Sequence, residues 1–222
     1  MQFGAVLLGL ALSYVLAVTV HGRLGTSLVL IVQIGTVGLA LRAAHAHRRV
    51  RMFAAGAMGL AAIAAVASLA SGGDGAQGAA FLAASLLYLV APVSLLRWIV
   101  RSGKVDRQTV LAAVAAYIMI GMFFAFLYRA IGLLQGGPFF GANGDGTNPQ
   151  VLFFSFTTLT TTGYGNLVPA VNPGQSFAVL EMLVGQLFLV TAVAKVITAW
   201  QPVKWGVDQD RAEGGTEPTK ET

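Results

Sequence analysis

Long runs of apolar residues, broken by short polar segments, make up most of this chain. A helix needs about 20 apolar residues to cross a hydrocarbon layer of about 30 Å. Six runs reach or approach this length: residues 4–20, 24–41, 52–70, 78–100, 109–134 and 176–200. The pattern therefore predicts an all-α membrane protein with six transmembrane helices. The first run lacks a basic n-region and a cleavage site before His21, so we expect it to be retained as a span.

Composition supports a membrane protein. Of the 222 residues, 56% are hydrophobic and 10% are charged, with a mean hydropathy of +0.73, whereas a soluble domain carries about 25% charged residues. The absence of cysteine excludes disulfides and thiolate metal sites. The sequence has no H-E-x-x-H or G-x-S-x-G motif. We therefore expect neither an enzyme nor a cofactor, and no nucleic-acid partner, because the basic residues lie in clusters between apolar runs.

The basic clusters predict how the chain lies in the membrane. They fall in residues 42–51 and in residues 97–107, and positive loops stay on the cytoplasmic side. With six spans, both termini are then cytoplasmic. Arg97, Arg101 and Lys104 have helical spacing and are suited to anionic lipid headgroups. We expect the chain in the cell membrane, as a bacterial inner-membrane protein.

The segment between the fifth and sixth runs, residues 135–175, does not have the pattern of a span. It opens with a stretch rich in glycine, typical of turns. Asn148 and Pro149 then predict a helix start, with asparagine as N-cap and proline at the first helical position. Residues 151–160 suffice for about three turns, too few to cross a bilayer. The pattern predicts a half-helix that enters the membrane from outside and stops partway.

Residues 160–165, T-T-T-G-Y-G, follow this half-helix. Non-helical backbone at membrane depth is tolerated where it is buried in protein or lines a wet cavity. The two glycines beside Tyr164 can take backbone angles that other residues resist, which lets consecutive carbonyls point the same way. Carbonyls from several chains can replace the water shell of a cation.

These six residues resemble the T-V-G-Y-G filter of the potassium channel superfamily, with Thr162 at the valine position. The resemblance covers residues 109–200 and implies an outer helix, a pore helix, a filter and an inner helix. It also implies a homotetramer, because one pore loop per chain supplies a quarter of the filter. Dehydrated K⁺ in single file is expected at the carbonyls of Thr161, Thr162, Gly163 and Tyr164 and the Thr161 hydroxyl, with Gly165 completing the outer mouth.

The resemblance also gives roles to the last span. Gly185 lies about twenty residues past the filter, where the inner helix of the family often bends; close helix packing is the alternative role for this small residue. By analogy, the inner cavity and gate are lined by Gln186, Leu189, Val193 and Ile197.

Some positions around the filter depart from the family. Asn166 replaces the usual aspartate, and Phe153 and Phe154 replace paired tryptophans. We expect support for the filter from Thr157, Thr158, Asn166, Arg129 and Glu181. Within the membrane, an Arg129–Glu181 ion pair is the expected brace. The alternative is a bond from Glu181 to Thr157 or Thr158, with Arg129 extending to the headgroups.

Three parts are therefore predicted. Residues 1–107 form a four-helix bundle without a recognisable voltage sensor, because the fourth span has no basic residue before Arg97. Residues 108–202 form the pore domain, and residues 203–222 a disordered cytoplasmic tail. The predicted function is a potassium-selective channel. The alternatives are a weakly selective cation channel and a non-conducting regulatory subunit.

Overall fold

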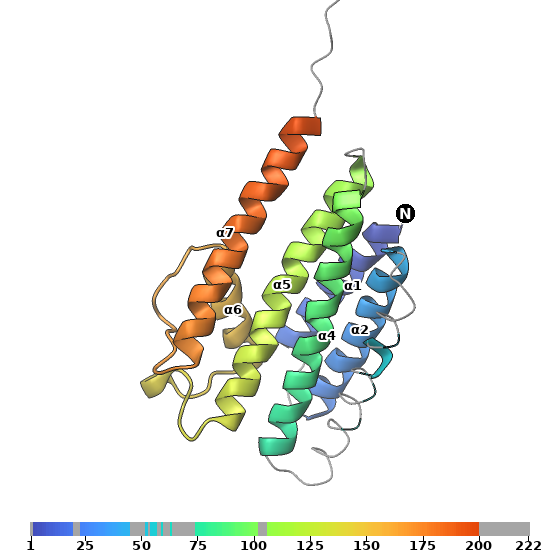
Figure 1. Ribbon diagram of the computed structural model, residues 1–222. Helices are drawn as coiled ribbons and strands as arrows, with labels where there is room; N and C mark the ends of the chain where they lie inside the picture. The colour runs from blue at the N-terminus through green and yellow to red at the C-terminus, as the bar shows by residue number, and fades with distance from the viewer. Residues whose placement is uncertain are drawn as a thin grey trace, which may run out of the picture.

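The computed structural model describes residues 2–19, 23–44, 52, 54–56, 59, 63, 74–101 and 106–199. Most of the third expected span (residues 52–70), Lys104 and the whole tail (residues 203–222) lie outside these residues. The regular structure of the described part is helical. Its elements, labelled as in Figure 1, are α1 (Gln2–Thr19), α2 (Arg23–Ala43), α4 (Asp74–Arg101), α5 (Arg107–Leu134), the 3₁₀ turn η1 (Gly141–Asn143), α6 (Asn148–Leu159) and α7 (Gly174–Ala199).

Three helices in the described residues are long and apolar enough to cross a membrane: Gly75–Arg101, Arg107–Leu134 and Gly174–Lys195. They correspond to the fourth, fifth and sixth predicted spans. The helices α1 and α2 coincide closely with the first two apolar runs. The chain is thus a helical, multi-pass membrane protein, and the full count of six spans remains a prediction.

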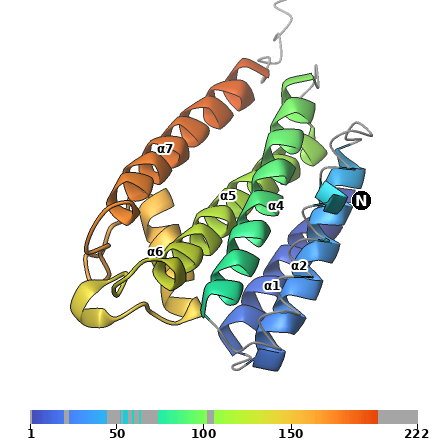
Figure 2. The same cartoon turned by 60° about the horizontal axis from the view of Figure 1, so that its bottom comes forward.

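The helix α5 lies at the centre of the packing. Figures 1 and 2 show α4 and α5 side by side, with α1 and α2 on one flank and α6 and α7 on the other. Two apolar cores meet on α5. One packs α5 against α1, α2 and α4, and contains Tyr88 and Met119. The other packs α5 against α6 and α7, and contains Phe154 and Leu159.

Side-chain caps determine where α5 begins. Asp106 Oδ1 accepts a hydrogen bond of 2.8 Å from the backbone N–H of Thr109, and the pair forms a capping box. The hydrogen bond from the Thr109 hydroxyl, together with that from its backbone N–H, holds the pKa of the Asp106 carboxyl below its ordinary value.

The pore-helix start differs by one residue from the prediction. Thr147, not Asn148, is the N-cap of α6, so Pro149 lies one position further into the helix. The reason is a second capping box: Gln150 Oε1 accepts the N–H of Thr147 at 2.8 Å, while the Thr147 hydroxyl accepts the N–H of Gln150.

The half-helix itself is as predicted. The 12 residues of α6 extend about 18 Å, short of a 30 Å hydrocarbon core. The segments before and after α6 lie at the same end of the bundle, where α5 ends and α7 begins (Figure 1). The chain therefore enters and returns on one side of the molecule.

The glycine-rich segment before α6 has an aromatic anchor that its turn pattern did not predict. Phe139 and Phe140 are buried in the core shared with α5 and α6. Asp145 Oδ1 accepts the Phe139 N–H at 2.8 Å, and the Phe139 carbonyl accepts the N–H of Ala170 at 2.9 Å. These bonds attach the entry segment to the return segment and fix both ends of the pore loop.

Candidate functional site

Left-handed backbone recurs at every second residue of the predicted filter. Thr161, Gly163 and Gly165 have φ of +56°, +53° and +79°. Glycine adopts this region freely, but a β-branched residue such as threonine is strained there by roughly 1–3 kcal/mol. Alternation of left- and right-handed residues turns successive peptide groups to the same side.

Hydrogen bonds to the end of the pore helix give the direction of these peptide groups. The carbonyl oxygen of Thr157 accepts the N–H of Thr162 at 2.8 Å and that of Gly163 at 3.1 Å. In a planar trans peptide the carbonyl points opposite to the N–H. The carbonyls of Thr161 and Thr162 therefore both point away from α6, on the same side.

That side is uncovered in the single chain. Residues 160–166 are all exposed, and the side chain of Tyr164 is 70% exposed. A row of carbonyls dehydrates a cation when carbonyls from other chains complete the ring. One chain therefore supplies one wall of such a site.

Aromatic stacking braces the back of the predicted filter, at one of the two phenylalanines expected to replace paired tryptophans. The ring of Phe153 stacks on Tyr164 with centroids 5.7 Å apart and planes 12° apart. Phe154 points into the core instead, where its ring lies 5.0 Å from Tyr128 and 5.3 Å from Phe140. The two phenylalanines thus have different roles: one packs against the filter, and the other holds α6 to α5 and the loop.

The other predicted supports act mainly through backbone groups. Thr158 is buried, and its carbonyl accepts the N–H of Thr161 at 2.9 Å. Asn166 is exposed, and its backbone carbonyl accepts a bond of 3.3 Å from the Asn143 side chain. Together with the Thr157 carbonyl, these contacts connect the filter to both the pore helix and the entry segment.

Glu181 lies at the centre of a buried network that joins three helices. Its side chain is fully buried, and its Oε2 accepts a bond of 2.7 Å from the Tyr128 hydroxyl of α5. Ser155 Oγ of α6 lies 2.6 Å from Glu181 Oε1 and 2.7 Å from the Gly121 carbonyl oxygen. One serine proton can serve one of these two contacts. If the Ser155 hydroxyl donates to the Gly121 carbonyl, the remaining contact needs a proton on Glu181, which would then be a neutral acid.

These partners replace the predicted Arg129–Glu181 ion pair. The Arg129 guanidinium donates to the carbonyl of Gly146, at 2.9 Å, in the segment that leads into α6. Tyr128 and Arg129 are consecutive on α5, so their side chains point about 100° apart around the helix axis. Because Tyr128 faces Glu181, Arg129 faces the loop. The alternative, a bond from Glu181 to Thr157 or Thr158, is also wrong, because the partner of Glu181 in the pore helix is Ser155.

Sequence analysis missed Tyr128 and Ser155 as partners. A signal was available for Ser155, since it is a lone serine inside the apolar stretch 151–156 of the pore helix. Buried hydroxyls in such a stretch need a hydrogen-bond partner. The signal for Tyr128 was weaker, because a tyrosine in an apolar helix packs equally well through its ring.

Gly185 permits close approach between α7 and the end of the pore helix. A Cβ at this position would overlap the carbonyl oxygen of Leu159, the last residue of α6. The Tyr117 hydroxyl donates to the same oxygen at 3.3 Å. The geometry supports the packing role of Gly185, and the hinge remains a prediction.

The rest of α7 has little protein around it in the single chain. In its most apolar stretch 22% of the residues are buried, against 61% in α5. Gln186 is exposed, whereas Leu189 and Val193 border a cavity shared with α4 and α5. The side chain of Ile197 lies outside the described residues. Pore lining by these four residues remains a prediction.

Comparison with known proteins identifies the same segment. Residues 112–201 match the family model described as "Ion channel". The voltage-gated delayed rectifier potassium channel KCNH5 of Homo sapiens is 36% identical over 70 residues, which are 32% of this chain and 7% of the relative. KCNH1 of Rattus norvegicus is 32% identical over 82 residues, 37% of this chain and 8% of the relative.

The chain therefore spans less than a tenth of the length of these relatives. No solved structure matches significantly. The description of the matching model as an ion channel agrees with the expectation that the chain is not an enzyme. Residues 112–201, which contain the half-helix and the filter backbone, thus match the model of an ion channel family, and the pore region is distantly similar to KCNH potassium channels.

Proposed function

We propose that this chain forms a potassium-selective channel in which dehydrated K⁺ passes in single file through a filter built from residues 161–165. The main support is the backbone of the filter. Every second residue is left-handed, and the carbonyls of Thr161 and Thr162 point together away from the pore helix. Uniform carbonyl direction is what replacement of the K⁺ water shell requires.

The proposal includes a homotetramer. One chain supplies one row of carbonyls on an uncovered face, and α7 is uncovered along most of its length. Closed fourfold symmetry brings four such rows around one axis and covers part of α7. The similarity to KCNH potassium channels supports the choice of ion.

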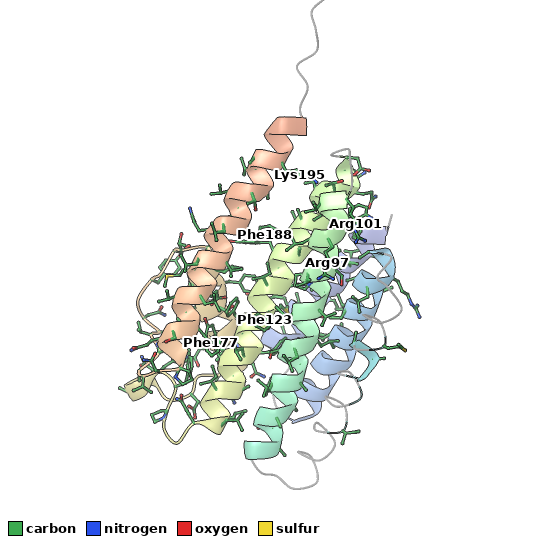
Figure 3. The ribbon with its side chains drawn as sticks, in the orientation of Figure 1. Arg97, Arg101, Phe123, Phe177, Phe188 and Lys195 are labelled. Atoms are coloured by element: carbon green, nitrogen blue, oxygen red, sulfur yellow. The ribbon has the colours of Figure 1, made fainter. Side chains whose placement is uncertain are left out.

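The proposed topology has six spans with both termini in the cytoplasm of a cell, as in a bacterial inner membrane. Residues 1–107 surround residues 108–202, the pore domain, and residues 203–222 form a cytoplasmic tail. The described ends of the helices support this arrangement, because Arg97, Arg101 and Lys195 share one end of the bundle (Figure 3) and the pore loop occupies the other (Figure 1). Positive charge favours the cytoplasmic side.

Flux through purified protein tests the function. Liposomes that contain the reconstituted chain and are loaded with K⁺ should release K⁺ when a proton ionophore balances the charge. Na⁺ used in place of K⁺ should give no comparable flux. In bilayers, a bi-ionic reversal potential that strongly favours K⁺ supports the proposal. A reversal potential near zero would establish the weakly selective cation channel instead. No flux from a well-folded assembly would support the non-conducting regulatory subunit.

A pair of glycine variants tests whether the selectivity of the flux depends on the filter. Gly163→Ala places a side chain on a residue with φ of +53°, at a cost of about 1–2 kcal/mol. Gly136→Ala is the matched control, because both sites are open and Gly136 has no left-handed angle. We expect selectivity to fall in Gly163→Ala and to remain unchanged in Gly136→Ala.

The topology can be tested directly because the chain has no cysteine. A single cysteine at Asn143, beside the filter, and another at Thr222, in the tail, are labelled in intact cells with a membrane-impermeant maleimide. Labelling of the Asn143→Cys variant alone supports the proposed orientation. Labelling of the Thr222→Cys variant alone would reverse it.

A further inference from the structure

The last turn of the pore helix α6 presents carbonyl groups that have no acceptor role inside the helix. Three of them accept the N–H groups of residues 160–163, which follow directly; these carbonyls belong to Phe156, Thr157 and Thr158. All of these bonds join near neighbours in the sequence. They attach the filter to α6, but they do not fix the end of α6 relative to the other helices.

The carbonyl of Leu159, the last residue of α6, is held from a different helix. The Tyr117 hydroxyl of α5 donates to it at 3.3 Å, and no other donor among the described residues reaches this oxygen. Leu159 is fully buried, so water does not reach its peptide group in the single chain. Gly185 brings α7 against the same oxygen. The Leu159 carbonyl is therefore enclosed between α5 and α7.

The two contacts of this carbonyl act differently. Packing at Gly185 limits how close the helices come, whereas a hydrogen bond is directional and determines which way the carbonyl points. The polar contact of Ser155 with the Gly121 carbonyl of α5 lies about one turn earlier in α6. The orientation of the last turn of α6 thus depends on the Tyr117 hydroxyl.

The ring of Tyr117 is itself held between α5 and α7. Its centroid lies 5.3 Å from that of Phe188, with the rings tilted by 39°, and Figure 3 shows Phe188 on the side of α7 that faces α5. Tyr117 also borders the largely apolar cavity between α4, α5 and α7. The other hydroxyl and ammonium groups that line this cavity have hydrogen-bond partners elsewhere: they belong to Thr109, Thr191 and Lys195. Loss of the Tyr117 hydroxyl therefore leaves the Leu159 carbonyl without a ready substitute.

We propose that Tyr117 is a positioning residue of the filter: its hydroxyl fixes the last carbonyl of α6 and so the place at which the chain enters residues 161–165. This inference rests on the proposed function. Thr161 comes two residues after Leu159 and has a left-handed backbone, a conformation that persists only where the surroundings hold it.

The position of Thr161 matters because its carbonyl and its hydroxyl are both proposed ligands of K⁺. A binding site needs its ligands within about 0.5 Å of their productive positions. When the last turn of α6 is free to rotate, Thr161 loses this precision. The preference for K⁺ over Na⁺ should then decrease, although the ring of Tyr117 and the fold of the chain are unchanged.

Replacement of single groups at residue 117 tests this role. Tyr117→Phe removes the hydroxyl and keeps the ring against Phe188. Full-length channels are reconstituted in bilayers, and the K⁺/Na⁺ permeability ratio is obtained from the bi-ionic reversal potential. We expect Tyr117→Phe to lower this ratio about two- to tenfold, the range that one hydrogen bond accounts for. Replacement of Tyr117 by 4-aminophenylalanine places an N–H donor on the same ring and should restore the ratio.

Tyr88→Phe is the matched control. Tyr88 is a buried tyrosine of α4, in the core that α5 shares with α1, α2 and α4 and away from α6. Removal of its hydroxyl should leave the permeability ratio unchanged. The control separates the specific loss at the end of the pore helix from the general effect of removing a tyrosine hydroxyl inside the bundle.

An unchanged ratio in Tyr117→Phe, with a selective wild type, would overturn the inference and leave the proposed function intact; a loss of stability alone would then mark Tyr117 as structural. A ratio that falls and is not restored by 4-aminophenylalanine would also overturn it. Wild-type channels without a preference for K⁺ would refute the proposed function, and this inference with it. If Tyr117→Phe chains do not assemble, co-expression with the wild type gives mixed channels. Their ratio should fall as the share of the variant rises, and independence from that share would again overturn the inference.

Discussion

The hydrogen bond between Tyr128 and Glu181 can be isolated with a double-mutant cycle. Both side chains are fully buried, and their oxygens are 2.7 Å apart. Tyr128→Phe removes the hydroxyl and leaves Glu181 Oε2 without its donor. Glu181→Leu removes the acceptor and leaves the Tyr128 hydroxyl alone in an apolar core. Each single change should destabilise the protein.

The magnitude follows from which groups lose a partner. A buried polar group left unsatisfied costs about 1–3 kcal/mol. In Glu181→Leu, Ser155 keeps an acceptor, because the Gly121 carbonyl oxygen lies 2.7 Å away. The main loss is therefore at Tyr128. The double variant removes both partners, so its cost should fall below the sum of the single costs by about 1–3 kcal/mol per chain.

The assay is the free energy of unfolding of each purified variant, measured by denaturant titration in one detergent. Tyr14→Phe on α1 is the matched control, because Tyr14 is 47% exposed. Combined with Glu181→Leu, it should be additive within about 0.5 kcal/mol. Additivity of Tyr128→Phe with Glu181→Leu would refute the reasoning, because it would mean that the two groups are not coupled.

Glu181→Gln tests whether the network contains a neutral acid. An amide can donate to Ser155 and accept from Tyr128, so it reproduces the hydrogen bonds of a protonated carboxyl. We expect this variant to lose less stability than Glu181→Leu and to keep its potassium flux. Equal damage by glutamine and leucine would show that the charge of Glu181, and not its hydrogen bonds, holds the three helices together.

Three further predictions concern other parts of the chain. Gly185→Ala forces a Cβ against the Leu159 carbonyl and should lower the stability of the assembly by about 1–3 kcal/mol in denaturant titration; Gly38→Ala on α2, where space is open, should not. Asn166→Asp adds a negative charge per chain at an exposed position beside the filter. It should raise K⁺ conductance at low salt and much less above about 0.1 M, and an unchanged conductance–salt curve would contradict this. The lowered pKa of Asp106 means that its cap stabilises α5 above the unfolded-state pKa and weakens as pH falls through the folded-state pKa. Asp106→Asn keeps a capping side chain without titration, so the protection factor of the Thr109 amide, which is corrected for the intrinsic exchange rate at each pH, should lose its acid dependence.

Hydropathy predicted the long helices because their length and apolar content are properties of the local sequence. The fifth span was expected at residues 109–134 and is Arg107–Leu134. The sixth was expected at residues 176–200 and is Gly174–Ala199. The differences are at the ends, where caps and not apolar residues determine the boundary. The half-helix and the glycine positions of the filter were likewise predictable, because short helix length and backbone freedom are local properties.

The partners inside the membrane were not predictable from the same pattern. Residue number gives the depth of a side chain along its helix. Arg129 and Glu181 were expected at similar depths, so depth alone allowed them to pair. Rotation about the helix axis decides which side chain of α5 faces α7, and an α5 that is apolar on most sides does not reveal it. The structure turns Tyr128 toward Glu181. Thr161 is a similar case: its left-handed angle opposes its own preference and is imposed by the hydrogen bonds around it.

The uncovered carbonyl face of residues 160–166 has a genetic consequence in the proposed tetramer. Because every chain contributes one wall of the filter, a single defective copy spoils the shared ion path. In a cell that makes normal and filter-defective chains in equal amounts, random mixing leaves about one assembly in sixteen composed of normal chains alone. In that tetramer a filter mutation would act as a dominant allele, whereas a mutation that prevents assembly would be recessive.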